Sequence, residues 1–258
     1  MSGMLKDKNI VVMGVANKWS IAWGIAEMCA AQGANLIFTY YGDRSLKSIE
    51  RLLKDAGLEG SLCVSCDVTT DEDIEDAFKT IASQVDEIHG VAHCIAHAKK
   101  EELRGLYMDT SREGFAMAQD ISAYSLVAVT RSATQYMNEG GSIVTLSYLG
   151  GERVVMNYNV MGVAKAALDS SVKYLAHDLG SRNIRVNGIS AGPIKTLAAK
   201  GVGEFNEIGR HFVDKAPLGR LVTQKEVGNA AVFFLSEMGS AVTGEVMHVD
   251  CGFNILGY

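Results

Sequence analysis

Short runs of apolar, mostly β-branched residues alternate with longer stretches of helical periodicity along the whole chain, and this alternation restricts the possible folds most. Several of the short runs are continuously apolar, which is typical of strands covered on both faces of a parallel sheet. Strands joined by helices in this way form right-handed crossovers, so the sequence predicts an α/β protein with a doubly wound, seven-stranded parallel sheet. The expected strands are 9–14, 35–40, 61–67, 90–96, 142–147, 185–191 and 245–249.

Helices are expected between these strands and should cover both faces of a Rossmann-type sheet. Residues 71–75 form an acidic first turn, which suits the positive end of a helix dipole. Gly33 and Gly180 stand where helix C-caps are expected. No Pro- or Ser-rich linker, charge block or repeat divides the 258 residues, so we expect a single domain spanning 1–258. The expected helices are 21–32, 46–56, 71–85, 112–137 and 157–179.

The charge and hydropathy of the chain exclude several classes of protein. A formal net charge of -6 argues against nucleic-acid binding, which usually needs a basic surface. The longest apolar runs are too short to span a bilayer. Residues 1–8 contain no apolar signal-peptide core, so we expect a cytoplasmic protein that does not contact a membrane.

The five cysteines are an odd number and lack the spacing of a disulfide framework. Cys63 and Cys66 form a C-x-x-C pair, which could be redox-active or bind a metal. However, residues 61–67 alternate like a strand, and the chain has no second C-x-x-C pair. We therefore interpret these residues as buried thiols in a reducing compartment.

The loop after the first strand is a candidate nucleotide-binding turn. It has Gly14 at the turn and Ser20 just before the helix, and the usual G-x-G-x-x-G pattern is absent. Gly14 permits a tight turn, and backbone N–H groups near Ser20 and Ile21 would face a pyrophosphate at the positive helix end. Taken alone, the same residues fit an ordinary strand–helix loop with a capping serine equally well.

Two further features concern how the chain would bind a nucleotide. Asp67 ends the third strand, where its carboxylate could hydrogen-bond an adenine amino group or instead cap the following helix. After the second strand come Tyr41 and Gly42, without a dense basic cluster to neutralise a 2′-phosphate. This favours NADH over NADPH, although Arg44 and Lys47 act in the opposite direction.

Tyr158 and Lys165 are the sharpest chemical feature, because a spacing of seven residues brings them to nearly one helix face. A second phenol, Tyr148, lies at the end of the fifth strand. Hydride addition to an α,β-unsaturated thioester leaves an enolate, whose oxygen needs a donor such as the Tyr158 phenol. Lys165 would hold the nicotinamide ribose hydroxyls. The pair by itself also fits a core tyrosine and a solvated lysine.

Three segments carry a family resemblance: Tyr148-Leu-Gly-Gly, residues 157–166 with Tyr158 and Lys165, and residues 190–197. They resemble the bacterial enoyl-acyl-carrier-protein reductases, divergent members of the short-chain dehydrogenase/reductase superfamily, over residues 9 to 253. The loop with Gly14 and Ser20 matches that subgroup as well. Ordinary members carry Tyr-x3-Lys, but four residues before Lys165 stands Met161, which cannot donate a proton. This absence argues against plain carbonyl reduction.

The resemblance implies an NADH-dependent enzyme that reduces the trans-2 double bond of a fatty acyl thioester on acyl carrier protein. It also implies a homotetramer. Tyr158, Tyr148 and Lys165 would be catalytic, and Ala98 would lie at the acyl site. Two departures affect the shape of the pocket: His97 replaces a common aromatic residue, and Met156 stands where the family can have proline. The residues implied around the cofactor are Gly14, Ser20, Ile21, Asp67, Val68, Ile95, Lys165, Ile194, Thr196 and Leu197.

Other patterns support weaker expectations. Met161, with Met156, is close enough to Tyr158 to line an acyl channel. His93 and His97 have the spacing of a metal pair, but packed or solvent-facing histidines explain them better. The Ala- and Gly-rich segment near 194–205 should be a mobile cover over the substrate.

Two other functions remain open at this point. One is a carbonyl-reducing dehydrogenase of the same superfamily, which the missing Tyr-x3-Lys disfavours. The other is a non-catalytic dinucleotide-sensing protein, in which Tyr158 and Lys165 would have no reason to accompany the cofactor loop.

Overall fold

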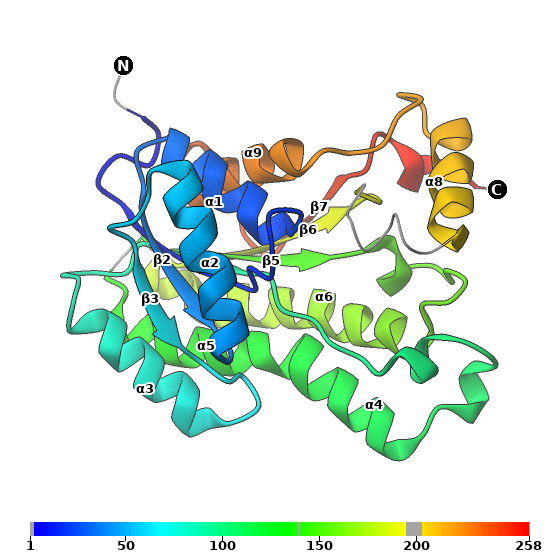
Figure 1. The fold of residues 1–258 in the computed structure, drawn as a ribbon, viewed down its shortest axis with the longest axis horizontal. Coiled ribbons are helices and arrows are strands. Elements are labelled where there is room, and N and C mark those ends of the chain that lie inside the picture. Colours follow the sequence, from blue (N-terminus) through cyan, green and yellow to red (C-terminus); the bar gives the residue numbers. More distant parts are fainter. Residues whose placement is uncertain (1–2, 139, 195–202, 258) are drawn as a thin grey trace.

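A seven-stranded parallel sheet forms the centre of the molecule in the computed structural model, which describes residues 3–138, 140–194 and 203–257. The strand order is β3-β2-β1-β4-β5-β6-β7, and every neighbouring pair is parallel (Figure 1). The predicted sheet is therefore confirmed, although the third and fourth strands are shorter than expected. The strands are β1 Asn9–Met13, β2 Asn35–Tyr40, β3 Leu62–Ser65, β4 Gly90–His93, β5 Ser142–Ser147, β6 Arg185–Ala191 and β7 Val246–Val249.

Both faces of the sheet are covered by helices. On β1, Ile10 and Val12 join the core under α1, α2 and α9, whereas Val11 and Met13 join the core under α3, α5 and α6. Strand side chains alternate between the two faces, so a continuously apolar strand supplies both cores. The helices are α1 Ile21–Ala31, α2 Asp43–Ala56, α3 Asp71–Ala82, α4 Arg112–Gln119, α5 Ser125–Ala133, α6 Asn159–Leu179, α8 Gly203–Lys215 and α9 Gln224–Leu235.

The helix predicted at 112–137 is divided into four pieces. A π-helical turn, η3 Asp120–Tyr124, separates α4 from α5, and a 3-10 turn, η4 Thr134–Tyr136, follows α5. Helical periodicity does not distinguish these windings, so the sequence pattern indicated one helix. Helices α8 and α9 were not predicted, although α9 begins with a capping box formed by Thr223 and Glu226.

The expected helix ends are partly confirmed. Gly33 has a φ of 86°, as a C-cap glycine requires, but Gly180 has a φ of -58° and continues α6 into a 3-10 turn. The chain leaves that turn at Asn183, whose φ is 53°. At the other end of α6, Asn157 has a φ of 60°, which delays the start of the helix from 157 to Asn159. The acidic first turn of α3 is confirmed by Asp71, Glu72 and Asp73.

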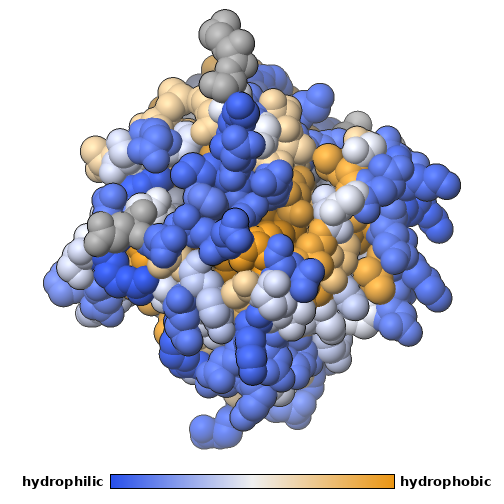
Figure 2. All heavy atoms as spheres, turned by 90° about the vertical axis from the view of Figure 1, so that its left-hand side faces the viewer, coloured by the Kyte–Doolittle hydropathy of each residue, from blue (hydrophilic) through white to orange (hydrophobic). Residues whose placement is uncertain are grey.

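The strand order reverses between β1 and β4, and ligands of such sheets bind beyond the carboxyl ends of the strands at this point. The opposite, amino ends of β1, β2 and β3 carry a separate hollow of about 1000 Å³, lined by residues such as Asn9, Leu58 and Leu62. Figure 2 turns the left-hand side of Figure 1 toward the viewer and shows apolar groups at its centre, surrounded by hydrophilic residues. No described helix is long and apolar enough to cross a membrane.

Candidate active site

The loop between β1 and α1 is built around Gly14 and Ser20. Gly14 has a φ of 88°, and a Cβ added there would lie 2.0 Å from the backbone oxygen of Cys94. Only glycine fits this close approach of β1 to the end of β4. The Ser20 hydroxyl accepts hydrogen bonds from the backbone N–H groups of Ala16 and Asn17, both at 3.1 Å. Because this hydroxyl does not cap α1, the amides at the positive end of α1 stay available to an anion.

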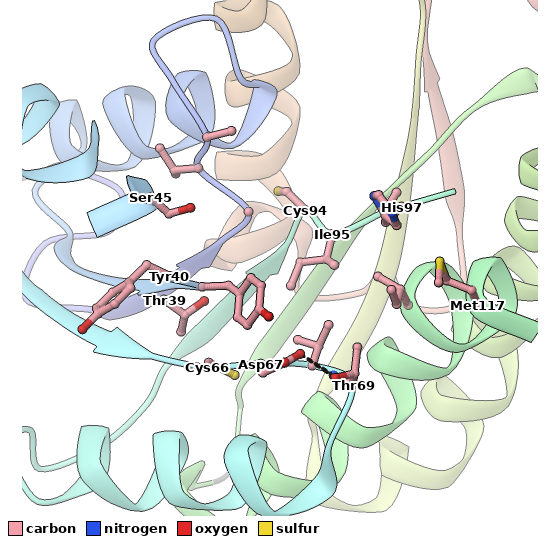
Figure 3. A pocket seen from close by; sticks show the side chains of 17 residues that line it. Thr39, Tyr40, Ser45, Cys66, Asp67, Thr69, Cys94, Ile95, His97 and Met117 are labelled. Carbon is pink, nitrogen blue, oxygen red and sulfur yellow. Dashed lines mark hydrogen bonds between the residues drawn. The ribbon is translucent and has the colours of Figure 1, made fainter. Parts of the chain in front are cut away.

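A hollow of about 580 Å³ opens from this loop across the carboxyl ends of β2, β3 and β4. In Figure 3, side chains from these strand ends converge on one space, and Met117 reaches it from α4. A dinucleotide fits such a place, because Gly14 leaves room for a phosphate and the walls offer apolar faces for a base. The lining residues are Gly14, Val15, Ala16, Thr39, Tyr40, Tyr41, Ser45, Cys66, Asp67, Val68, Thr69, Cys94, Ile95, Ala96, His97, Met117 and Ile121.

Asp67 lines this hollow, as the nucleotide interpretation requires, and it does not cap α3. Its Oδ1 accepts hydrogen bonds from the backbone N–H and the hydroxyl of Thr69, at 2.9 and 2.7 Å (Figure 3). The N-cap of α3 is Thr70, whose side chain accepts from the N–H of Asp73. The alternative that Asp67 caps α3 is therefore wrong. A contact between Asp67 and adenine stays a prediction.

The start of α2 is more basic than the sequence suggested. Arg44, Lys47 and Arg51 line a second hollow of about 540 Å³, together with Asp43 and Ser48. The Ser48 hydroxyl donates a hydrogen bond to the backbone oxygen of Ala16 at 2.9 Å, which links this hollow to the cofactor loop. Arg51 was not considered from the sequence, although its helical spacing from Arg44 and Lys47 places the three cations on one face.

Tyr148 and Tyr158 lie together at the carboxyl end of β5. Tyr158 is the N-cap of α6 and not part of the helix, because the left-handed Asn157 precedes it. Burial raises the pKa of Tyr158 well above its ordinary value, and Tyr148 and Asp169 raise it further. Burial also raises the pKa of Tyr148. Both phenols are therefore protonated at neutral pH and can donate hydrogen bonds.

Lys165 is buried beside them. Its Nζ donates a hydrogen bond to the backbone oxygen of Leu146 at 2.6 Å. Burial lowers its pKa to about 8, because low dielectric disfavours the ammonium, while Asp169 and Cys94 act in the opposite direction. The structure thus brings Tyr148 and Tyr158 into contact and places the Lys165 ammonium at Leu146, two residues before Tyr148, and a solvated lysine is excluded.

A glycine turn, η5 Leu149–Gly151, lies between Tyr148 at the end of β5 and the start of α6. A Cβ added at Gly150 would lie 2.4 Å from Cδ1 of Tyr158, and one added at Gly151 would lie 3.0 Å from the backbone nitrogen of Ala166. The guanidinium of Arg153, just after the turn, donates to the backbone oxygens of Asn254, at 2.7 Å, and of Leu256. The turn is therefore fixed against α6 on one side and against the C-terminal residues on the other.

The remaining predicted residues are placed as follows. Met161 is buried in the first turn of α6, while Met156 is 78% exposed. Ala98 is half-buried, directly after His97 at the rim of the cofactor hollow. Ile194 is buried and forms a parallel bridge to Val222. Thr196, Leu197 and most of the expected cover near 194–205 lie outside the described residues.

His93 and the C-x-x-C pair are structural. The two ring nitrogens of His93 lie 3.0 Å from the Thr145 hydroxyl and 2.9 Å from the Ser125 hydroxyl, within the core. Burial raises the pKa of Cys66 to about 12 and also raises that of Cys63, so neither thiol is a ready nucleophile. The described residues contain no group of three potential metal ligands.

Sequence reasoning missed two polar groups near the site. Ser122, on the π-turn, accepts a hydrogen bond from the His97 N–H at 2.9 Å and donates one to the His97 backbone oxygen at 3.0 Å. Asp169 follows Lys165 by four residues, and this spacing could have indicated it. Ser122 had no comparable signal, because its partner is 25 residues away.

Comparison with known proteins gives a consistent result. A family profile described as Enoyl-(Acyl carrier protein) reductase matches residues 14–254. The chain is 58% identical to the enoyl-acyl-carrier-protein reductase (NADH) FabI of Bacillus cereus, over 98% of this chain and 99% of that protein. It is 53% identical to the Staphylococcus aureus enoyl-acyl-carrier-protein reductase (NADPH) FabI, over 98% of both.

Solved structures agree with these relatives. The Bacillus cereus enoyl-acyl carrier protein reductase with NADP+ and indole naphthyridinone superposes with a TM-score of 0.95 at 58% identity, covering 99% of this chain and all of that one. The Anaplasma phagocytophilum reductase in complex with NAD gives 0.96 at 44% identity, covering 100% and 98%. Fold, family profile and relatives coincide over nearly the whole length, and the chain belongs to the enoyl-acyl-carrier-protein reductase family.

Proposed function

We propose that this chain reduces the trans-2 carbon–carbon double bond of enoyl thioesters on acyl carrier protein with NADH, the last reductive step of type II fatty acid elongation. The single observation that carries the proposal is the presence of two protonated phenols and a buried lysine at the carboxyl end of β5, the strand that pairs with β4, whose own carboxyl end lines the 580 Å³ hollow. Relatives named for this activity match almost the entire chain.

The catalytic residues act on charge that develops in the substrate. When bound, NADH supplies the hydride that adds to the β-carbon of the enoyl group. The electron pair of the double bond moves toward the thioester carbonyl, and the Tyr158 hydroxyl donates a hydrogen bond to the resulting enolate oxygen. A proton taken up from solvent then adds to the α-carbon and completes the reduction. Tyr148 supplies a second donor next to Tyr158.

Lys165 binds the cofactor in this proposal. Its ammonium holds the ribose hydroxyls next to the nicotinamide and places positive charge near the enolate. Gly14, Ser20 and Ile21 surround the pyrophosphate, and Asp67 and Val68 contact the adenine. Ile95, Ile194, Thr196 and Leu197 contact the remainder of the cofactor.

The acyl group is assigned to the side of the site formed by Tyr148, Tyr158, Met161 and Ala98. The segment near 194–205 is assigned to cover it, since Ile194 follows β6 at the carboxyl end of the sheet. Amide exchange that is equal across this segment in free and ligand-bound protein would exclude such a cover.

NADH is proposed as the preferred cofactor, the cytoplasm as the location and a homotetramer as the assembly. Tyr41, Gly42 and the acidic Asp43 follow β2, where a 2′-phosphate would lie, and these residues support NADH. The neighbouring cations Arg44 and Lys47 allow residual use of NADPH.

One assay separates this function from its alternatives. We expect the protein to oxidise NADH with a trans-2-enoyl thioester and to leave a 3-ketoacyl thioester unchanged. A carbonyl-reducing dehydrogenase would consume the 3-ketoacyl substrate instead. A dinucleotide-sensing protein would bind NADH and oxidise it with neither substrate.

A further inference from the structure

Asp169 is an acidic residue in the active centre to which the proposed reaction assigns no role. It lies on α6 one turn after Lys165, and side chains four residues apart on a helix are neighbours. The η5 turn covers it closely, because a Cβ added at Gly151 would lie 2.9 Å from Asp169 Oδ2. Its Oδ1 is shielded from solvent and has no hydrogen-bond partner among the described residues. A buried carboxylate oxygen in this situation needs an electrostatic partner.

The electrostatic partner of Asp169 is Lys165, which is hydrogen-bonded to the end of β5. The backbone oxygen of Leu146 accepts the hydrogen bond from Lys165 Nζ. The next residue, Ser147, is buried, and its hydroxyl also has no well-formed hydrogen bond within the described part of the chain. That hydroxyl is nevertheless near enough to lower the pKa of Asp169. The ammonium of Lys165 and the carboxylate of Asp169 are therefore directed to the same strand end.

We propose that Asp169 is a positioning residue for the reaction, whose carboxylate keeps Lys165 charged in its buried place so that the ammonium can hold the cofactor. The inference rests on the function proposed for Lys165 above. A buried ammonium loses its proton readily unless a negative group stands nearby, and Asp169 provides that group.

The charges around Lys165 support this assignment. Asp169 is the first of the groups that raise the pKa of Lys165 against the effect of burial, and Cys94 is the second. On β4 and the loop after it, the pKa of His93 is lowered to about 3 and that of Cys94 is raised to about 12, so both side chains are neutral near pH 8. Tyr158 is also neutral there, because burial raises its pKa. Asp169 thus supplies the main negative charge that acts on Lys165.

The groups around Asp169 act on its own pKa in both directions. Burial raises its pKa, and the carboxylate of Glu152, just after η5, acts in the same direction. Ser147, Lys165 and Lys173 lower it, and both lysines lie on α6 within one turn of Asp169. The net effect raises the pKa of Asp169, while three groups on two elements act in favour of the carboxylate form.

Equilibrium binding of NADH, followed by protein fluorescence from about pH 6 to 10, tests the proposal without turnover. In the wild-type protein Kd should rise as the pH passes the Lys165 pKa of about 8, where the ammonium is lost. Asp169→Asn keeps the shape and removes the charge. It should move this rise about one pH unit lower, so that NADH binds roughly fivefold more weakly at pH 8.

Two variants serve as controls. Asp178→Asn removes an exposed carboxylate from the same helix and should leave the binding profile unchanged. Asp169→Glu retains the charge and should keep the rise near its wild-type position. If Asp169→Asn does not fold, Asp169→Ser removes the carboxylate with a smaller side chain and has the same expected profile.

A wild-type profile in the variant that lacks the carboxylate would overturn the proposal. The proposal would also be overturned if the rise in Kd moved equally far in Asp169→Glu, because packing and not charge would then cause the shift. Lys165→Ala separates this failure from that of the underlying function. If Lys165→Ala binds NADH normally, the role of Lys165 is wrong; if it binds weakly while Asp169→Asn is unaffected, only the role of Asp169 is wrong.

Discussion

The rings of Tyr148 and Tyr158 meet edge to face, with 4.9 Å between their centroids and 70° between their planes. Tyr148 directly follows β5 and Tyr158 is the N-cap of α6, so the contact joins the sheet to the helix that carries Lys165. Edge-to-face packing restricts both rings and hence the positions of their hydroxyl groups. We therefore expect the two phenols to act as one fixed donor pair.

Within this pair, Tyr158→Phe should lower kcat about a hundredfold, since losing one donor to a developing oxyanion costs on the order of 3 kcal/mol. KM for NADH should change little, because the hydroxyl acts on the acyl group. Tyr148→Phe should lower kcat far less. Steady-state kinetics with a trans-2-enoyl thioester measure both variants, and the opposite order of effects would reverse the two assignments.

Gly150→Ala should reduce kcat by roughly tenfold to a hundredfold, because the added methyl group would overlap the Tyr158 ring and displace its hydroxyl. Gly180→Ala is the matched control, since a Cβ there meets no atom within 4 Å and φ is -58°. Thermal unfolding of both variants shows whether the fold is retained. Equal kinetics for the two would mean that Tyr158 adapts without loss.

Lys165→Ala should raise KM for NADH much more than it lowers kcat, because the ammonium contacts the cofactor before and during the reaction. In the wild-type enzyme, kcat/KM for NADH should fall as the pH rises through about 8, since a lysine with a lowered pKa loses its charge at that lower pH. The pH profile of Lys165→Ala should lack this fall. A profile identical to wild type would show that another group titrates.

We expect cofactor choice to depend on the basic face of α2 formed by Arg44, Lys47 and Arg51. We expect a higher kcat/KM for NADH than for NADPH, and the double variant Arg44→Ala, Lys47→Ala should lower NADPH use further. NADH use should be unaffected, because no 2′-phosphate is then present. A clear preference of the wild-type enzyme for NADPH would mean that these cations outweigh Asp43.

We expect assembly to depend on the apolar side chains that α4, the π-turn and α6 expose. Phe115, Tyr124, Val163 and Tyr174 are 40%, 44%, 37% and 73% exposed, which suits a surface between subunits better than contact with water. Light scattering at micromolar concentration should give the mass of a homotetramer. Tyr174→Glu should reduce that mass, whereas a monomeric wild-type protein would contradict the prediction.

The sheet could be predicted because each strand is a short apolar run whose side chains enter two cores, as Val11 and Val12 do on β1. The winding of the segment after Arg112 could not, since the π-turn at Asp120–Tyr124 depends on tertiary contacts such as that between Ser122 and His97. The local periodicity of the sequence does not predict such contacts.

The candidate site likewise contains residues that the sequence could predict and contacts that it could not. Tyr148, Tyr158 and Lys165 could be found because their spacing relative to a strand and a helix is short-range information. The meeting of Gly14 with the backbone of Cys94 joins residues 80 positions apart, and only the parallel pairing of β1 with β4 reveals it. The start of α6 at Asn159 was missed because Asn157 takes a left-handed conformation.

The bonds from Arg153 to the backbone of Asn254 and Leu256 have a practical consequence for anyone who produces this protein. The same short stretch of chain carries Gly150 against Tyr158 and Gly151 against α6. We therefore expect an affinity tag or reporter fused after residue 258 to disturb the proposed catalytic centre through this guanidinium. Leu5 and Asp7 bond to the backbone of Gln32 and Gly33 at the far ends of the strands, which makes the amino end the safer place for a fusion.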